Sequence, residues 1–176
     1  MDYEKKDVCT LAILVNNKAG VLMRVVSLFS RRGYNIDSLS VGETENPERS
    51  RITIVVRGDR LIVEQIIRQV EKLVDVINVF EMTRGGSVQR ELVLVKINAD
   101  NFTRPSVLEI AELFKAKIID VTPTTLTMQI TGSLDKLDSF MELIKQFGVV
   151  ELVRTGITAL ERGSRSIDNT TFGEEG

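Results

Sequence analysis

The feature that most constrains the fold is a single order of sequence patterns that occurs twice along the chain. In strands, apolar residues alternate or form short unbroken runs, whereas helices repeat them every three to four residues. Between residues 8 and 82 these patterns follow the order strand, helix, strand, strand, helix, strand. The same order returns between residues 90 and 160, without obvious identity of the residues themselves. The pattern therefore predicts two copies of one architecture.

In the first copy, a strand with apolar residues on both faces precedes a turn at Gly20, which predicts a central strand. Gly33 fits the position just past the first helix, where glycine often ends helices. We expect strands at 8–16, 34–43, 51–57 and 75–82, and helices from Gly20 and from Gly58. Right-handed crossover connections place both helices on one face of an antiparallel sheet. This is the ferredoxin-like βαββαβ plan, an α+β fold.

In the second copy we expect strands at 91–97, 117–122, 124–131 and from Val149, and helices from Thr103 and Ser133. Thr103 is the predicted N-cap of its helix. The threonine-rich strand at 124–131 fits either an exposed face or a second subunit interface, and its sequence leaves both open. The second copy is therefore also predicted to be ferredoxin-like, in tandem with the first.

The domain boundaries follow from the segments that lack these patterns. Adjacent glycines at 85 and 86 are typical of a linker. Beyond residue 160 the chain is rich in Gly, Ser, Asn, Thr and charge, which is typical of disorder. We predict an N-terminal extension at 1–7, a first domain at 8–83, a linker at 84–89, a second domain at 90–160 and a disordered tail at 161–176.

Composition narrows the class of protein. The chain carries 25 acidic and 23 basic residues, so it has no net positive charge to hold a nucleic acid backbone. Its apolar runs are far shorter than the ~20 residues that span a bilayer, and residues 1–7 lack the apolar core of a signal peptide. We expect a cytoplasmic protein that binds neither nucleic acid nor membrane.

Residues for catalysis and metal binding are scarce. The chain has no histidine, the commonest general base and metal ligand, and its one cysteine cannot form a Cys/His zinc cluster. Cys9 lies in an apolar strand, which agrees with a reducing compartment. Its two interpretations are a small buried hydrophobic residue and a reactive thiol. We therefore expect neither a metal site nor a catalytic site in this chain.

The turn at 16–22 is the strongest candidate for a binding site. A strand that leads through a glycine turn into a helix leaves several backbone N–H groups unpaired at the positive end of the helix dipole, where a small carboxylate can bind. Asn17 and Asn35 can both donate and accept hydrogen bonds, and neighbouring apolar residues can hold an aliphatic side chain. These groups together could bind a free amino acid. They also have a purely structural interpretation, in which Asn17 caps the turn, Gly20 relieves strain and Asn35 starts a strand.

The first copy also resembles a known family. The βαββαβ order with Asn-Lys-Ala-Gly-Val-Leu at 17–22 after the first strand resembles the ACT domain, a family of small-molecule sensing modules. Longer stretches resemble the regulatory, or small, subunits of acetolactate synthase, also called acetohydroxyacid synthase. These stretches lie at 29–39, 72–76, 90–96 and 118–122. The resemblance runs from about residue 8 to residue 163 and so includes both copies.

This resemblance implies a regulatory role and a site. In the family, two ACT domains pair side by side into one continuous sheet, and valine binds at their interface as a feedback inhibitor of branched-chain amino-acid synthesis. Carried over by motif position, the effector-binding residues are Asn17, Ala19, Gly20, Val21 and Leu22 of one subunit, with Asn35 and Ile36 of the other. The family often has a small hydroxyl residue where this chain has Met23, which changes the polarity expected there.

The resemblance also implies partners. The chain is expected to form a homodimer through its ACT domains and to activate a separate catalytic, or large, subunit without being an enzyme itself. Thiamine diphosphate, magnesium and flavin belong to that catalytic subunit, and this chain has no glycine-rich phosphate-binding motif for them. We expect no cofactor in this chain.

Three other classes share part of the pattern. A stand-alone ACT regulator of another enzyme has the same first domain. RNA-binding modules have the same element order, but they need aromatic residues on the central strands, and the strand at 51–57 has none. Acylphosphatase-type hydrolases also share the topology, but their phosphate-binding turn needs an arginine, where this chain offers Lys18.

Overall fold

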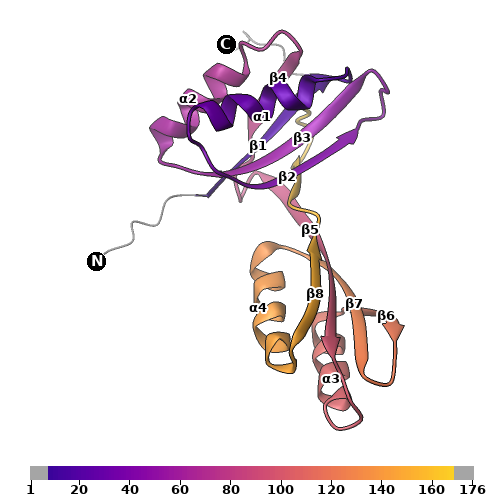
Figure 1. The fold of residues 1–176 in the computed structure, drawn as a ribbon. Coiled ribbons are helices and arrows are strands. Elements are labelled where there is room, and N and C mark those ends of the chain that lie inside the picture. The colour runs from indigo at the N-terminus through magenta and orange to yellow at the C-terminus, as the bar shows by residue number, and fades with distance from the viewer. Residues whose placement is uncertain (1–7, 169–176) are drawn as a thin grey trace, which may run out of the picture. The chain divides into compact units, whose positions relative to one another are not determined.

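The computed structural model describes residues 8–168. The predicted N-terminal extension at 1–7 and residues 169–176 lie outside this range. The chain divides into two compact units (Figure 1). Within the described range, the first unit consists of residues 8–89 and 157–168, and the second of residues 90–156.

The first unit is an antiparallel sheet with two helices on one face (Figure 1). Its strands are β1 (Val8–Asn16), β2 (Ile36–Glu43), β3 (Arg49–Arg57) and β4 (Val76–Glu81), and its helices are α1 (Val21–Arg31) and α2 (Arg60–Val70). The strand order β2-β3-β1-β4 makes β1 central and leaves β2 and β4 at the edges. The predicted ferredoxin-like fold and the central position of the first strand are confirmed.

Alternation along β1 explains the core of this unit. Leu11 and Ile13 point toward the helices and pack with Phe29 of α1 and Ile66 of α2, and all four are fully buried. Ala12 of the same strand belongs to a separate apolar cluster, on the other face of the sheet. Because successive side chains of a strand point to opposite faces, β1 is buried on both sides.

The ends of α1 follow the local sequence. Gly20 precedes the helix with φ of 84°, a left-handed conformation that a side chain would strain. At the other end, Gly33 has φ of 70°, and the N–H groups of Gly33 and Tyr34 donate to the carbonyls of Ser30 and Phe29. This is a Schellman ending. Because Tyr34 takes part in it, β2 begins at Ile36 and not at residue 34 as predicted.

The second unit repeats the plan. It contains β5 (Ser87–Asn98), α3 (Arg104–Phe114), β6 (Lys117–Val121), β7 (Thr125–Gly132), α4 (Leu134–Ile144) and β8 (Val149–Arg154), with a short 3₁₀ turn at Lys145–Phe147; β5 starts within the first unit. The strand order is β6-β7-β5-β8. The rings of Phe114 and Phe140 lie 5.5 Å apart between α3 and α4. Thr103 is the N-cap of α3, but its side chain makes no capping bond; the Asp100 carboxylate accepts from Thr103 N instead (2.8 Å), which lowers the pKa of Asp100.

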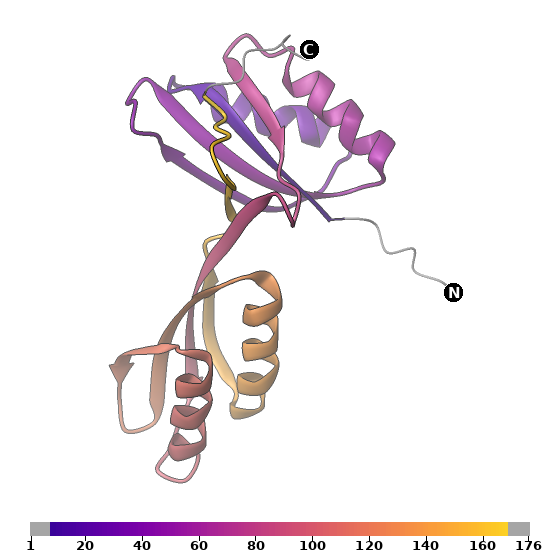
Figure 2. The same cartoon turned by 180° about the vertical axis from the view of Figure 1, so that it is seen from behind.

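The structure differs from the predicted domain boundaries in two places. The predicted linker at 84–89 belongs to the first unit, and β5 begins inside it at Ser87. The second difference comes after residue 156. Residues 157–168 return to the first unit, where β9 (Thr158–Glu161) pairs with β5. Ala159 and Ile167 are buried in one cluster with Ala12 and Leu14. The ribbon of the returning segment crosses the face of the sheet away from the helices (Figure 2). Residues 161–168, predicted as part of a disordered tail, are therefore ordered by packing because they cover an apolar face.

Polar contacts hold this returning segment to the sheet. The Arg51 guanidinium donates to the carbonyl of Ala159 (2.6 Å), and the buried Asn78 amide donates to the carbonyl of Ile167 (2.8 Å). The Asp168 carboxylate forms an ion pair with Arg49. Burial lowers the pKa of Arg51, and the negative charges of Asp168 and Glu161 oppose that effect. The segment thus covers apolar residues on this face and supplies acceptors to Arg51, Asn78 and Arg49.

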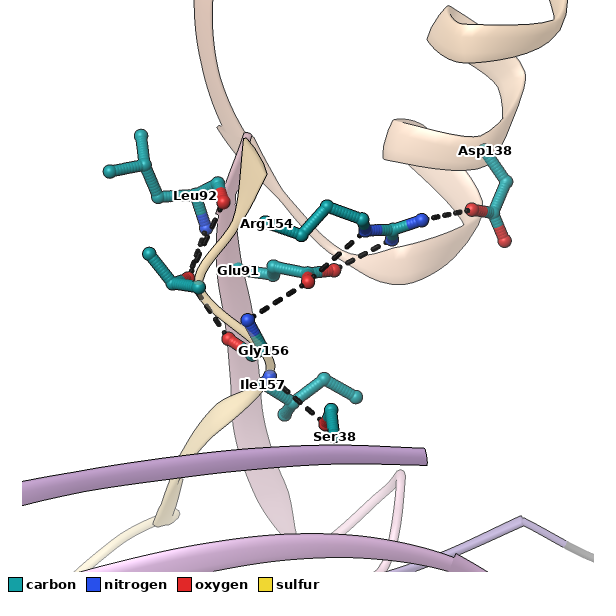
Figure 3. Close-up of polar contacts among 8 residues, drawn as sticks. Ser38, Glu91, Leu92, Asp138, Arg154, Gly156 and Ile157 are labelled. Atoms are coloured by element: carbon teal, nitrogen blue, oxygen red, sulfur yellow. Dashed lines mark hydrogen bonds and ion pairs between the residues drawn. The ribbon is translucent and has the colours of Figure 1, made fainter. Parts of the chain in front are cut away.

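A buried carboxylate anchors the end of the second unit. Glu91 accepts from the Arg154 guanidinium (2.7 and 3.1 Å) and from the N–H of Gly156 (3.1 Å), and Asp138 lies on the far side of Arg154 (Figure 3). The hydrogen bond with Glu91 raises the pKa of Arg154. Gly156 has φ of 79°, so the chain turns there with a geometry that favours glycine.

Candidate functional site

Asn17 lies where β1 leads into the turn and is held by the neighbouring hairpin. Its side-chain amide donates to the Glu43 carboxylate (3.0 Å) and to the carbonyl of Pro47 (2.9 Å), and its backbone N–H donates to the carbonyl of Glu48 (2.7 Å). Both donors of the Asn17 amide are therefore used within this chain, in bonds to the hairpin and not in a cap of the turn. The side-chain oxygen of Asn17 remains able to accept, and the residue is exposed.

The start of α1 presents free donors at the surface. The first intrahelical bond of α1 runs from Arg24 N–H to the carbonyl of Gly20 (3.1 Å), and Val21 N–H reaches the carbonyl of Lys18 (3.3 Å). Within residues 8–168, no acceptor is bonded to the N–H groups of Leu22 and Met23. Two amides at the positive end of the helix dipole are thus available to an anion.

The predicted apolar contacts are unequal. Ala19 and Leu22 are exposed at this turn, and the Met23 side chain is 68% exposed. Val21 is buried in the core and supports the turn from beneath. A Cβ added at Gly20 would meet no atom within 4 Å, so a ligand can approach the backbone there closely.

Asn35 and Ile36 lie at the other end of the sheet. Ile36 opens β2 opposite Val56, whereas Glu43 closes β2 opposite Ser50, at the same end of the sheet as Asn17. Eight residues of strand separate the two groups by roughly 25 Å within one chain. The Asn35 amide donates to the Asp37 carboxylate (3.1 Å). The structure therefore brings Asn17, Ala19, Gly20, Val21 and Leu22 together and leaves Asn35 and Ile36 apart from them.

Cys9 is placed as a structural residue. It is 7% exposed in the core of the first unit. Burial, together with the neighbouring Glu81 carboxylate, raises the pKa of the Cys9 thiol to about 12. A thiol with such a pKa is almost entirely protonated at neutral pH and is a poor nucleophile. The structure thus favours the buried hydrophobic interpretation over the reactive one.

Two kinds of feature are absent from the described part of the chain. Among residues 8–168, no group of three or more His, Cys, Asp or Glu side chains is placed to hold a metal ion. No helix in this range is long and apolar enough to cross a membrane.

Sequence reasoning missed the residues that return to the sheet. Ile157, Ala159 and Ile167 are buried, yet they are spaced among polar residues and give no clear period. Their partners on the first sheet did carry a signal, because Ala12 and Leu14 made the second face of β1 apolar. An apolar second face indicates that some segment covers it, but it does not indicate which residues form that segment.

Comparison with known proteins gives a consistent family. The family model described as "AHAS small subunit-like ACT domain" matches residues 11–78, and the model "Small subunit of acetolactate synthase" matches residues 90–163. The chain is 44% identical to a probable acetolactate synthase small subunit of Methanothermobacter thermautotrophicus, over 92% of this chain and 96% of that protein. It is 47% identical to the acetolactate synthase small subunit of Mycobacterium bovis, over 90% of this chain and 94% of that protein.

A solved structure agrees with these matches. The crystal structure of the acetolactate synthase small subunit from Thermotoga maritima superposes with a TM-score of 0.83 at 39% identity, over 90% of this chain and 99% of that one. Sequence identity at this level over nearly the whole of both chains, together with two matching domain models in the same order, defines the family. The chain belongs to the family of acetolactate synthase small subunits.

Proposed function

We propose that this chain activates the catalytic subunit of acetolactate synthase and makes it sensitive to feedback inhibition by valine in branched-chain amino-acid biosynthesis. In this proposal the chain is not itself catalytic. Thiamine diphosphate, magnesium and flavin are held by the catalytic subunit. Family membership supports the regulatory role, and the free amides of Leu22 and Met23 support the effector site.

The position of β2 supports a site shared by two subunits. β2 is an edge strand, so the side away from β3 is free to pair with another strand. If two copies pair antiparallel through β2 about a two-fold axis, the end of β2 that opens at Ile36 lies beside the partner strand's end at Glu43. Asn17 is bonded to Glu43, so the turn of one subunit then lies beside Asn35 of the other.

The groups gathered in this way match the parts of valine. The amides of Leu22 and Met23 and the positive end of α1 suit the carboxylate of valine. The amide oxygens of Asn17 and Asn35 can accept from its ammonium group. Leu22 and Ile36 offer apolar surface for the isopropyl group.

The mechanism in this proposal is thermodynamic linkage. Valine inhibits only to the extent that it binds the poorly activating form of the regulatory dimer more tightly than the activating form. A coupling free energy of ~1–3 kcal/mol gives a useful response. A ligand shared across the β2 edge depends on how two subunits are placed, so it can select between two arrangements of the dimer.

The test is reconstitution. The protein is mixed with a thiamine-dependent acetolactate synthase catalytic subunit, and acetolactate formation is followed with and without valine. Stimulation that valine reverses is the expected result. The proposal would be overturned if the catalytic subunit were not stimulated and valine had no effect. Valine binding without stimulation would favour a stand-alone ACT regulator of another enzyme.

A further inference from the structure

A cavity in the first unit adjoins the turn of the shared effector site, and Val21 belongs to both. Its volume is about 210 Å³, and it opens between the first turns of α1 and the segment that connects α2 to β4. The residues that line it are Val21, Arg24, Val25, Lys72, Leu73, Val74, Asp75 and Val76. Residues 72–76 form one of the stretches that carry the family resemblance, yet the proposed effector site uses none of them.

The base of the cavity is apolar. Val21 and Val25 are buried in α1, and Leu73 and Val76 pack against the same core from the connecting segment. The segment is held in place by its backbone, because Val76 N–H donates to the carbonyl of Leu73 (3.0 Å), and the carbonyl of Asp75 accepts from Asn16 N–H (2.9 Å). The apolar surface is therefore preformed.

The rim of the cavity carries charges of both signs. The Asp75 side chain is only 11% exposed and forms an ion pair with Arg24, whose own side chain is 62% exposed. Lys72 is exposed on the same rim. A carboxylate has room for about four hydrogen bonds, so Asp75 can accept from a ligand in addition to Arg24. Lys72 can move toward a bound anion because its side chain is exposed, and Arg24 has further N–H donors for an anion besides the one paired with Asp75.

We propose that this cavity binds a short aliphatic α-amino acid, at a second site that lies wholly within one subunit. The volume of about 210 Å³ equals roughly seven waters of liquid at ~30 Å³ each, which matches a ligand the size of valine. The ammonium group binds Asp75, the carboxylate binds Arg24 and Lys72, and the aliphatic chain lies against Val25 and Val76. This site is additional to the effector site proposed above.

The charges select against simpler ligands. A fatty acid of the same size lacks the ammonium group, so it leaves the spare acceptor positions of Asp75 unused. An aliphatic amine lacks the carboxylate, so it leaves Lys72 without an anion in the cavity while Arg24 keeps its ion pair with Asp75. A zwitterion uses both the Asp75 acceptor and the cations of the rim. Binding also restrains the start of α1, which carries the Leu22 and Met23 amides of the shared site.

The experiment follows backbone and methyl NMR signals of the full-length protein during titration with valine, 3-methylbutanoate and isobutylamine. The variants are Asp75→Asn and Lys72→Gln; the second changes an exposed side chain and so should leave folding intact. Asp138→Asn is the matched control, since it removes a carboxylate from an ion pair in the second unit. Gly20→Asp serves to disable the shared site.

The proposal expects saturable valine-dependent shifts at residues 72–76 that persist in Gly20→Asp and Asp138→Asn. Asp75→Asn should lower the valine affinity measured from these signals at least about tenfold, as loss of a charge-assisted hydrogen bond does. Lys72→Gln should lower that affinity less. Shifts confined to Asn35 and Ile36 would overturn this site while supporting the shared one. Shifts at residues 72–76 of equal size with 3-methylbutanoate would also overturn it. So would an Asp75→Asn variant that binds valine unchanged but no longer activates the catalytic subunit, because the cavity would then receive that subunit.

Discussion

The carboxylate of Glu91 accepts two hydrogen bonds from the guanidinium of Arg154, at 2.7 and 3.1 Å, while the Glu91 side chain is only 5% exposed (Figure 3). Removing one partner of such a pair strongly destabilises the protein, because the other partner is left buried, charged and unpaired. Arg154→Met should therefore lower the free energy of unfolding of the second unit. Since Arg154 is one-third exposed, we expect about 2 kcal/mol, below the ~3–5 kcal/mol of a fully buried pair.

Denaturant unfolding monitored by circular dichroism measures this change. Lys145→Met is the control, because its ion pair with Glu142 is exposed on both sides and contributes at most about 0.5 kcal/mol. Equal stability of Arg154→Met and Lys145→Met would show that the Glu91 contact does not stabilise the unit.

The turn before α1 offers a charge test of the shared site. Gly20→Asp should weaken valine inhibition by at least about tenfold while activation survives, because the new carboxylate repels that of the ligand. Asn and Asp both tolerate the left-handed conformation better than other residues, so Gly20→Asn is a neutral control with similar backbone strain. Valine titrations by calorimetry distinguish the two, and an unchanged affinity in Gly20→Asp would remove Gly20 from the site.

A substitution at Gly33 tests the cost of backbone strain, because an added Cβ there makes no new contact. The φ of Gly33 is 70°, and a Cβ there would meet no atom within 4 Å. Gly33→Ala should therefore cost about 1–2 kcal/mol from left-handed strain alone. Gly85 is also open but has no positive φ, so Gly85→Ala should change the free energy of unfolding by less than about 0.5 kcal/mol. A thermal melt in which both variants behave alike would contradict the strain argument.

The returning segment should be required for the first unit. A chain that ends at Gly156 loses Ala159 and Ile167 and uncovers Ala12, Leu14 and Met82. We expect a lower midpoint of thermal unfolding and increased binding of a dye specific for apolar surface. A chain that ends at Asp168 keeps every described contact of the segment and is the matched control. If both truncated chains melted at the same temperature, the segment would not stabilise the sheet.

Cys9 should make stability fall in alkaline solution. Its pKa rises from an ordinary value of 9.0 to about 12 in the folded protein. Below pH 9 both states keep the proton, so Cys9 adds no dependence on pH. Between pH 9 and 12 the unfolded state loses the proton while the folded state keeps it, so the free energy of unfolding falls, by up to about 1.4 kcal/mol per pH unit.

This slope is measured by denaturant unfolding at several pH values between 8 and roughly 10, and Cys9→Ala is the reference because it removes the titrating group. The wild-type curve should fall more steeply than that of Cys9→Ala above pH 9. Parallel curves would show that the thiol ionises as readily in the folded protein as in the unfolded one.

Local patterns were enough to predict the four α-helices and every described strand except β9. Apolar spacing determined the helices to within a few residues, and Gly33 marked the end of α1. The start of β2 was predicted too early, because the backbone of Tyr34 is used in the helix ending. Such exchanges between neighbouring elements depend on hydrogen bonds that periodicity does not report.

The candidate site was predicted from sequence only in part. The turn from Asn17 to Leu22 is continuous in the chain, so its donors are placed by local structure. That Asn35 and Ile36 lie at the opposite end of the sheet depends on the antiparallel pairing of β2 with β3. The cavity beside Asp75 likewise depends on how the segment after α2 packs on α1.

The sequence by itself determined that β1 is central and buried on both faces, because its apolar residues occupy both sides of the strand. Only the tertiary structure decided which segment covers the second face. The hydrophobic effect is not directional and does not depend on separation in the sequence, so many apolar segments could have covered this face. The buried bond from Asn78 to the carbonyl of Ile167 joins residues 89 positions apart, and it exists only once the chain has passed through the second unit and returned to the first.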